Sequence, residues 1–303
     1  MRRVLCLLLI LSIFLLAACN PGDSTPDIST PSTSSNALAT KEQDTESGTS
    51  AQTNASTVSQ TQTSGYSTAN PDTSPAVPQL KKVTLPEGYT FWQIARTLEA
   101  NGICKAKDFF DAAQGYTVQS FTVPNNKNAA YRYEGFLFPA TYELYTGEAP
   151  VEVLKKMLNA YAEYSGMPDY NTLILASVIE RETRSAEQMA MISSVFHNRM
   201  ADGIKLGSDA TAEYVNNYIV QNGTWIKDPD RYRALYNTAW NPNFTGVLPA
   251  GPICSPGARA INAAKNPAKS GYYYFFFGAD NQNHYSKTYE THEAQIAQFG
   301  LGY

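Results

Sequence analysis

Two carboxyl groups at the end of an apolar run are the residues of this 303-residue chain best suited to acid–base chemistry. Glu180 and Glu182 follow Leu173 to Ile179, a stretch whose apolar and small side chains point in every helical direction. Such a helix is expected inside a protein rather than at its surface. A carboxyl group in a partly apolar site has a raised pKa and stays protonated at neutral pH, so it can act as a general acid. Cleavage of a glycosidic bond needs such an acid.

The two glutamates are two residues apart and therefore lie on roughly opposite sides of the predicted helix, so they do not share a site. Glu180 lies above small side chains, Ala176 and Ser177, which we interpret as room for a groove. Glu182 lies above a bulkier stripe, which predicts packing and a basic or backbone partner. A structural alternative for Glu180 is a buried ion pair with an arginine, namely Arg181, Arg184 or Arg199.

Apolar spacing predicts the elements that position these carboxyl groups. Helices are expected over 150–164, from a cap at Asp169 or Asn171 through Thr183, and after the Ser185–Gln188 capping-box pattern. An aromatic run, 272–277, predicts a buried strand that returns through 284–286 as a hairpin, followed by a closing helix over 291–299.

Before them, 82–85 reads as a strand, Thr90 as the cap of a helix, and 106–113 as a second short helix. Strand, helix and helix in this small space resemble a LysM-type unit, a module that often binds glycan in secreted bacterial proteins. A simple packing cap on the following domain is the alternative.

The N-terminus predicts export. Arg2 and Arg3 precede a short apolar segment and small residues, the order of a secretory signal. Leu16-Ala17-Ala18-Cys19 resembles a bacterial lipobox, which makes Cys19 the predicted lipid anchor at the outer face of the cytoplasmic membrane; an ordinary signal peptide is the alternative. Residues 20–80 are polar and rich in Ser and Thr, which predicts a disordered tether.

Charge and cysteine content exclude several classes of function. A net charge of −4 offers no electrostatic case for nucleic acid as a partner. After loss of Cys6 and lipidation of Cys19, only Cys104 and Cys254 remain, which make neither a disulfide framework nor a metal cluster. Whether these two pair or stay as free thiols is left open. We expect no cofactor and no metal.

Several segments in one order resemble the MltG-like (YceG-like) endolytic murein transglycosylase family. The resemblance covers about 81–299, nearly the whole folded part, and is carried by 134–142 (EGFLFPATY), 175–183 (LASVIERET), 194–200 (SVFHNRM), 206–211 (LGSDAT), 236–238 (YNT), 248–253 (LPAGPI) and 256–257 (PG), with Tyr274-Phe275, His284 and the late 290–292 (ETH).

The resemblance implies a peptidoglycan lytic transglycosylase. It would cleave the MurNAc–GlcNAc bond of nascent glycan strands to leave 1,6-anhydro-MurNAc ends, and so limit strand length. Glu180 is implied as the catalytic residue, first protonating the bridging oxygen and then acting as base on the sugar's own 6-hydroxyl. Because this nucleophile is tethered to the reacting carbon, no second carboxylate is needed.

The resemblance also implies substrate-binding residues, for each of which a structural role is the alternative: Glu134, Asn198, Ser208, Asp209, Tyr236, Asn237 and Thr238. Asp209 has a further alternative as a second carboxylate, whose distance from Glu180 would separate transglycosylation from hydrolysis. The implied partners are peptidoglycan glycan strands, the membrane through the lipid anchor, and the penicillin-binding proteins and elongation machinery of wall synthesis.

The expected fold class is α+β, with a small LysM-like N-terminal module followed by a mainly helical catalytic domain with small antiparallel sheets. The expected domains are a lipoprotein signal peptide (1–19), the Ser/Thr-rich tether (20–80), the LysM-like module (81–127) and the transglycosylase domain (128–303). Two other functions remain as alternatives. One is a non-catalytic peptidoglycan-binding or scaffold protein, and the other is a metal-dependent hydrolase using His197, His284 and His292.

Overall fold

A computed structural model describes residues 27–28, 77–223, 225–244 and 247–302 of the chain. The strands are β1 (Asp27–Ile28), β2 (Leu80–Leu85), β3 (Ala140–Tyr145), β4 (Tyr274–Phe277) and β5 (Asn283–Ser286). The helices are α1 (Phe91–Ala100), α2 (Ala106–Gly115), α3 (Pro150–Tyr164), α4 (Tyr170–Glu182), α5 (Ala186–Ala201), α6 (Asp209–Glu213), α7 (Tyr232–Tyr236), α8 (Ala258–Lys265) and α9 (Tyr289–Phe299). A π-helix, η1 (Tyr214–Gln221), and a 3-10 helix, η2 (Pro229–Arg231), complete the set. The α+β class with small sheets is confirmed.

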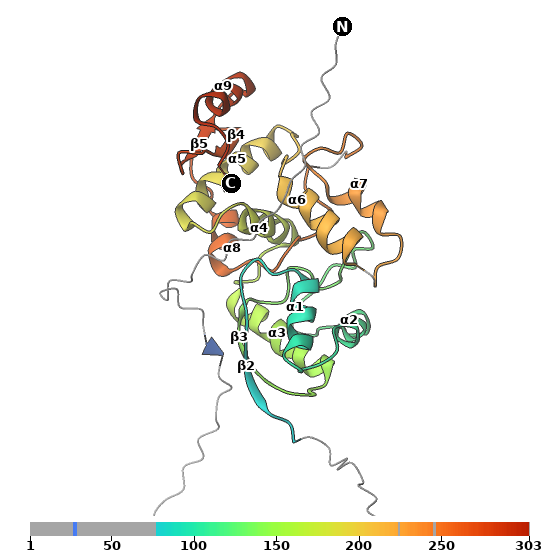
Figure 1. The fold of residues 1–303 in the computed structure, drawn as a ribbon. Helices are drawn as coiled ribbons and strands as arrows, with labels where there is room; N and C mark the ends of the chain where they lie inside the picture. Colours follow the sequence, from blue (N-terminus) through green and yellow to red (C-terminus); the bar gives the residue numbers. More distant parts are fainter. Residues whose placement is uncertain (1–26, 29–76, 224, 245–246, 303) are drawn as a thin grey trace, which may run out of the picture.

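One end of the molecule is built from β2, α1, α2, β3 and α3 (Figure 1). Thr90 and Gln93 form a reciprocal capping box that starts α1 as predicted. β2 pairs antiparallel with β3, with Leu80 opposite Tyr145 and Leu85 opposite Ala140. β3 was not predicted, because its glycine- and proline-containing approach and dense aromatics do not read as a regular strand. This partner strand lies beyond the 81–127 range predicted for the module.

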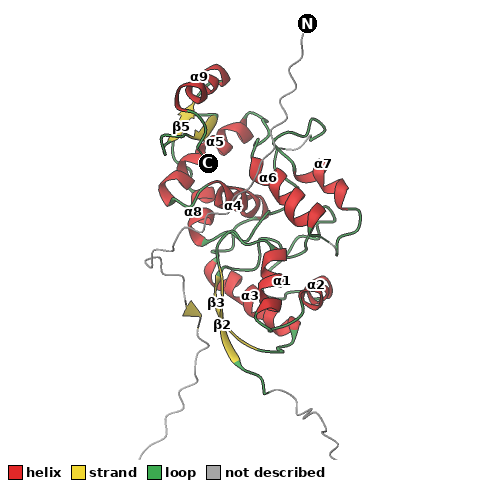
Figure 2. Cartoon of the chain, viewed as in Figure 1, coloured by secondary structure: helices red, strands yellow, loops and turns green. Residues whose placement is uncertain are grey.

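α4 is the central helix of the remaining part, with α5, α6 and α8 packed around it (Figure 2). Asp169 caps it, since its Oδ1 accepts the Thr172 N–H at 3.0 Å. Every side chain from Leu173 to Glu180 is buried. The prediction of an internal helix that ends in carboxyl groups is therefore confirmed.

The C-terminal hairpin is present, but it is less buried than predicted. β4 and β5 pair antiparallel, with Tyr274 opposite Ser286, and α9 packs against both. Of β4, only Phe276 is buried, and Phe277 is 43% exposed. The aromatic run reads as a core strand, yet this two-stranded sheet lies at the edge of the molecule and is covered mainly by one short helix (Figure 1).

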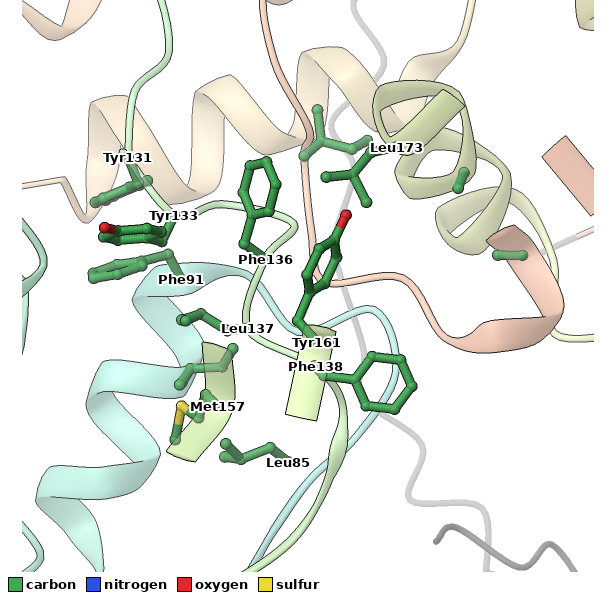
Figure 3. Packing of buried hydrophobic residues seen from close by; sticks show 14 of the residues in the cluster. Leu85, Phe91, Tyr131, Tyr133, Phe136, Leu137, Phe138, Met157, Tyr161 and Leu173 are labelled. Atoms are coloured by element: carbon green, nitrogen blue, oxygen red, sulfur yellow. The ribbon is translucent and has the colours of Figure 1, made fainter. Parts of the chain in front are cut away.

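One hydrophobic core joins the two parts. Phe91 of α1 stacks on Phe109 of α2 at 5.4 Å and on Tyr131 at 5.0 Å between ring centroids. Figure 3 shows side chains of α1, the 131–138 segment and α3 meeting Leu173 of α4 in this core. The N-terminal elements are therefore held in a fixed position relative to α4.

The predictions about export lie mostly outside the described residues. This holds for the signal peptide, for Cys19 and for most of the tether. Of the tether, the structure describes Asp27–Ile28, which pair in parallel with β3, and the residues from 77 onward. Among the described residues, no helix combines the length and apolarity that crossing a membrane requires. Cys104 and Cys254 are both free thiols.

Candidate active site

Glu180 lies at the C-terminal end of α4 and faces the start of α8. Its side chain is nearly buried, with 8% of the residue exposed. Oε2 accepts the backbone N–H of Gly257 at 3.0 Å, and Gly257 is the N-cap residue of α8. The carboxyl group thus lies at a helix N-terminus, where the helix dipole and free N–H groups favour its ionised form.

A turn from the N-terminal end of the molecule reaches this site. The Gly88 N–H donates to the Ser255 carbonyl at 2.9 Å, and the Ser255 N–H donates to the Tyr89 carbonyl at 2.8 Å. These bonds place Glu87 beside Gly257, where it pairs with Arg259 at 2.9 Å. A Cβ atom on Gly257 would lie 1.8 Å from Glu87 Oε1, so any larger residue there would have to displace the Glu87 side chain.

Sequence reasoning missed Glu87. No local pattern indicates that Glu87 and Gly257, which are 170 residues apart in the sequence, meet. A pairing of the turn with the end of the Pro-Gly loop is visible only in three dimensions.

The surroundings of Glu180 bring its pKa close to neutral pH. The pKa of the carboxyl group is raised to about 7, mainly by burial and in smaller part by the negative charge of Glu87. The Gly257 N–H bond, Arg259 and Arg184 lower the pKa. A group with this pKa can give up a proton and take one back at neutral pH, which suits a general acid that later acts as base.

Glu182 lies on the opposite face of α4, as predicted, but with a different partner. The Ser208 hydroxyl donates to Glu182 Oε1. The pKa of Glu182 is raised to about 7, mainly by burial and in smaller part by the charges of Asp209 and Glu213. The hydrogen-bond partner is thus a serine rather than a basic or backbone group, because α6 begins against this face and supplies Ser208. A basic side chain is also near, since Arg181 lowers the pKa of Glu182 while it pairs with Glu213 at 3.7 Å.

The predicted groove along the small side chains of α4 is filled by protein. The segment 251–257 is buried throughout and packs against this stripe. The Ile253 N–H donates to Ser177 Oγ at 3.0 Å, and the Cys254 thiol donates to the Ser177 carbonyl at 3.2 Å. The interpretation as a groove was wrong, because small side chains here allow another backbone segment to approach closely.

Glu134 and Tyr236, two predicted substrate-binding residues, have partners in the interior. Glu134 is 1% exposed and accepts the Phe91 N–H and the Tyr214 hydroxyl, both at 2.9 Å. Burial raises its pKa to about 8. The Tyr236 oxygen accepts the Ala130 N–H at 3.2 Å. This geometry favours the structural alternative, in which Glu134 joins α1 to η1.

Three predicted residues gather beside Glu182 rather than Glu180. Ser208 contacts Glu182, and its N–H donates to Thr238 Oγ1 at 3.1 Å. Asp209 is the first residue of α6 and is exposed. Partial burial of its carboxyl group raises the pKa of Asp209, and the charge of Glu213 raises it as well.

The two predicted asparagines lie elsewhere. Asn237 Oδ1 accepts the N–H groups of Ala239 and Trp240, each at 3.1 Å, and so shapes the turn after α7. Asn198 on α5 donates to the carbonyls of Ser270 and Tyr272, at 3.1 and 2.8 Å. None of the seven residues is hydrogen-bonded to Glu180 within the part of the chain that the structure describes.

The three histidines have separate surroundings. His197 Nδ1 lies 2.9 Å from the Ser193 carbonyl, His284 pairs with Asp280 at 3.0 Å, and His292 stacks on Tyr274 at 5.3 Å. Within the described residues, no group of three or more His, Cys, Asp or Glu side chains is placed to share a metal ion.

Known proteins resemble this chain over most of its length. The profile of the YceG-like family matches residues 41–298. An endolytic murein transglycosylase of Streptococcus pneumoniae serotype 2 (strain D39 / NCTC 7466) is 30% identical over 254 residues, which are 74% of this chain and 45% of that protein. One of Bacillus subtilis (strain 168) is 31% identical over 182 residues, 55% of this chain and 48% of that protein.

A solved structure agrees with the fold. The crystal structure of a yceG-like protein from Listeria monocytogenes superimposes with a TM-score of 0.59 at 29% identity, covering 71% of this chain and 75% of the other. The chain spans about half the length of the curated relatives that it matches. With the profile match extending over most of its residues, the chain belongs to the YceG-like family.

Proposed function

We propose that this protein is a peptidoglycan lytic transglycosylase with Glu180 as its acid and base. The relatives that bear the name endolytic murein transglycosylase support the reaction class. The observation that carries the proposal is the setting of Glu180, a nearly buried carboxyl group with a pKa of about 7 at the N-terminus of α8.

In the first step, protonated Glu180 donates its proton to the bridging oxygen between MurNAc and GlcNAc as the bond from that oxygen to the anomeric carbon breaks. The Gly257 N–H, Arg259 and Arg184 stabilise the carboxylate that results. In the second step, the carboxylate takes the proton of the muramyl 6-hydroxyl, whose oxygen bonds to the anomeric carbon. The proton is back on Glu180, no water is consumed, and the product has a 1,6-anhydro end.

Contact with the glycan by the seven predicted residues belongs to this proposal. Asp209 is exposed and can meet the substrate directly. Glu134, Tyr236 and Thr238 are buried and hydrogen-bonded inside the protein, so their effect on the glycan site is indirect. They would keep the N-terminal elements and the loops after α5 and α7 in place.

We also propose the layout that delivers the enzyme to its substrate. Residues 1–19 act as a signal peptide, Cys19 carries the lipid anchor, and 20–80 form the tether. The LysM-like module binds glycan, and the pairing of β2 with β3 supports a boundary near Tyr145 rather than residue 127. Anchored at the outer face of the cytoplasmic membrane, the enzyme would cut nascent strands beside penicillin-binding proteins and limit strand length.

Incubation with purified glycan strands separates this function from that of a scaffold. The wild-type protein is expected to release muropeptides with 1,6-anhydro ends, detected by mass spectrometry. A Glu180→Gln variant is expected to bind the strands and release none. Binding without any product from the wild-type protein would support the scaffold instead.

A further inference from the structure

A cavity of about 710 Å³ lies at the other end of α4 from Glu180. Its lining comes from the end of α2, the 123–132 loop, Tyr170 at the start of α4, and the 225–232 segment that includes η2. The volume is that of a site for a small molecule or for a short part of a polymer. Since α4 rises about 1.5 Å per residue, Tyr170 and Glu180 are roughly 15 Å apart along the helix.

The charge of the lining has one sign. Four basic residues are among those that line the cavity (Lys127, Arg132, Lys227 and Arg231), and no acidic residue is among the lining residues. None of the four has an ion-pair partner within the described ranges. The chain as a whole carries a net charge of −4, so this cluster runs against its overall balance. Like charges in a hollow concentrate their field and attract an anion.

The two arginines are already held in place. Arg132 donates to the Gln114 carbonyl at 3.0 Å, and Arg231 donates to the Lys127 carbonyl at 2.8 Å while lying 4.8 Å over the Tyr232 ring. Their acceptors are neutral, so both charges remain available. A guanidinium group positioned in this way suits the two oxygens of a carboxylate.

Contacts within the protein hold the walls of the cavity in place. Asn126 donates to the Ala250 carbonyl and to the Tyr170 hydroxyl, which fastens the 123–132 loop to the catalytic part. Phe110 and Trp225 pack with ring centroids 5.4 Å apart and give the lining an apolar portion. Apolar rings next to fixed cations suit a peptide that carries both carboxylates and aliphatic groups.

We propose that this cavity binds the carboxylate-bearing stem peptide of a glycan strand, at a position roughly 15 Å from the bond that Glu180 cleaves. The inference rests on the proposed function, because it takes the glycan strand as substrate. Peptide binding at a distance from the reacting bond would position the strand and would favour strands that still carry their peptides.

Binding of short end-labelled strands to the full chain in a Glu180→Gln background tests the inference without turnover. Strands with intact peptides are expected to bind about tenfold more tightly than strands stripped by an amidase, as two partly screened charge pairs would give. Lys127→Gln/Lys227→Gln removes two of the four cations and is expected to reduce this preference by about threefold, because Arg132 and Arg231 remain. The matched control, Lys269→Gln/Lys287→Gln, changes two exposed lysines near the C-terminal hairpin and is expected to keep it.

Equal binding of both strand types, or a preference that is undiminished in Lys127→Gln/Lys227→Gln, would overturn the inference. Stripped strands with a terminal phosphate supply the other anion, and tighter binding of these than of peptide-bearing strands would overturn the assignment to carboxylate. Failure of the proposed function is seen separately, as the absence of cleavage products from the protein with Glu180 intact.

Discussion

The two faces of α4 at its C-terminal end carry carboxyl groups with the same pKa in unlike surroundings. The pKa values of Glu180 and Glu182 are both raised to about 7, mainly by burial. Around Glu180 lie a backbone N–H donor, a helix N-terminus and two arginines, which stabilise the carboxylate. Around Glu182 lie a serine hydroxyl, two further acids, Asp209 and Glu213, which raise its pKa, and Arg181, which lowers it.

This difference shows that a perturbed pKa alone does not identify a catalytic acid. A group that donates a proton must exist for a time as an anion, and its surroundings have to stabilise that anion. The Glu180 face has such groups, and they come from two separate segments of the chain. Glu182 has two carboxylate neighbours that oppose its ionisation where Glu180 has one, and its hydrogen bond comes from a serine hydroxyl rather than a helix N-terminus, so we assign Glu182 a role in holding α6 against α4.

The sharpest way to break this comparison is to neutralise each carboxyl group in turn. Glu180→Gln is expected to lower kcat/KM by about a hundredfold to ten-thousandfold, the range for loss of a general acid. Glu182→Gln keeps the shape and one hydrogen bond to Ser208, so we expect a loss below about tenfold. Steady-state cleavage of purified strands gives both numbers, and an equal loss in the two variants would contradict the assignment.

Next in size is the effect of adding one methyl group to the Glu180 site. Gly257→Ala places a Cβ at 1.8 Å from Glu87 Oε1 and so displaces either Glu87 or the N–H that holds Glu180. We expect activity to fall by about a hundredfold, as for a small misplacement of reacting groups. Gly115→Ala is the matched control, because nothing lies within 4 Å of its new Cβ. Restoration of activity by Gly257→Ala/Glu87→Ala would confirm that the clash is with Glu87.

A smaller effect is expected from removing the negative charge of Glu87. Its charge raises the pKa of Glu180, so Glu87→Gln lowers that pKa and leaves less of the protonated acid at neutral pH. The alkaline limb of the pH–activity profile is expected to move to lower pH, with activity at pH 8 reduced about two- to threefold. Glu143→Gln, on the distant β3, serves as control. A profile that does not move would remove Glu87 from the account.

The smallest effect on activity, but a clear one on stability, is expected at Glu134. The pKa of Glu134 is about 8 in the folded protein and near 4.5 in the unfolded chain. Between pH 4.5 and pH 8 the folded state therefore binds one proton more than the unfolded state. The stabilisation is complete below pH 4.5 and is lost as pH rises through 8. Thermal unfolding should therefore occur at lower temperature at pH 8 than at pH 5. Glu134→Gln should flatten this dependence, and an unchanged slope would contradict it.

Much of the helical part was predictable, because its determinants are local. The apolar spacing around α3, the Asp169 cap of α4 and the Thr90–Gln93 capping box each act within a few residues. The order of motifs indicated the family and, through the resemblance, Glu180, whereas the apolar helix by itself indicated only that two carboxyl groups lie at its end.

What could not be predicted depends on contacts between distant segments. Glu87 enters the site through backbone bonds between the turn before α1 and the loop before α8. β3 pairs with β2, which is distant in the sequence, and the segment that leads into β3 is an aromatic stretch with turn residues at Gly135 and Pro139. Glu134 matched a family motif, but only the structure shows that it caps α1 and binds Tyr214.

The central claim is that one carboxyl group moves the proton in both steps and that the sugar's own hydroxyl is the nucleophile. Digestion of purified glycan strands in ¹⁸O-labelled water, followed by mass spectrometry, tests it most directly. The account predicts ring-closed 1,6-anhydro ends without ¹⁸O from the wild-type protein and from Glu182→Gln, and none from Glu180→Gln. Reducing ends that carry ¹⁸O, or anhydro ends released by Glu180→Gln, would contradict it.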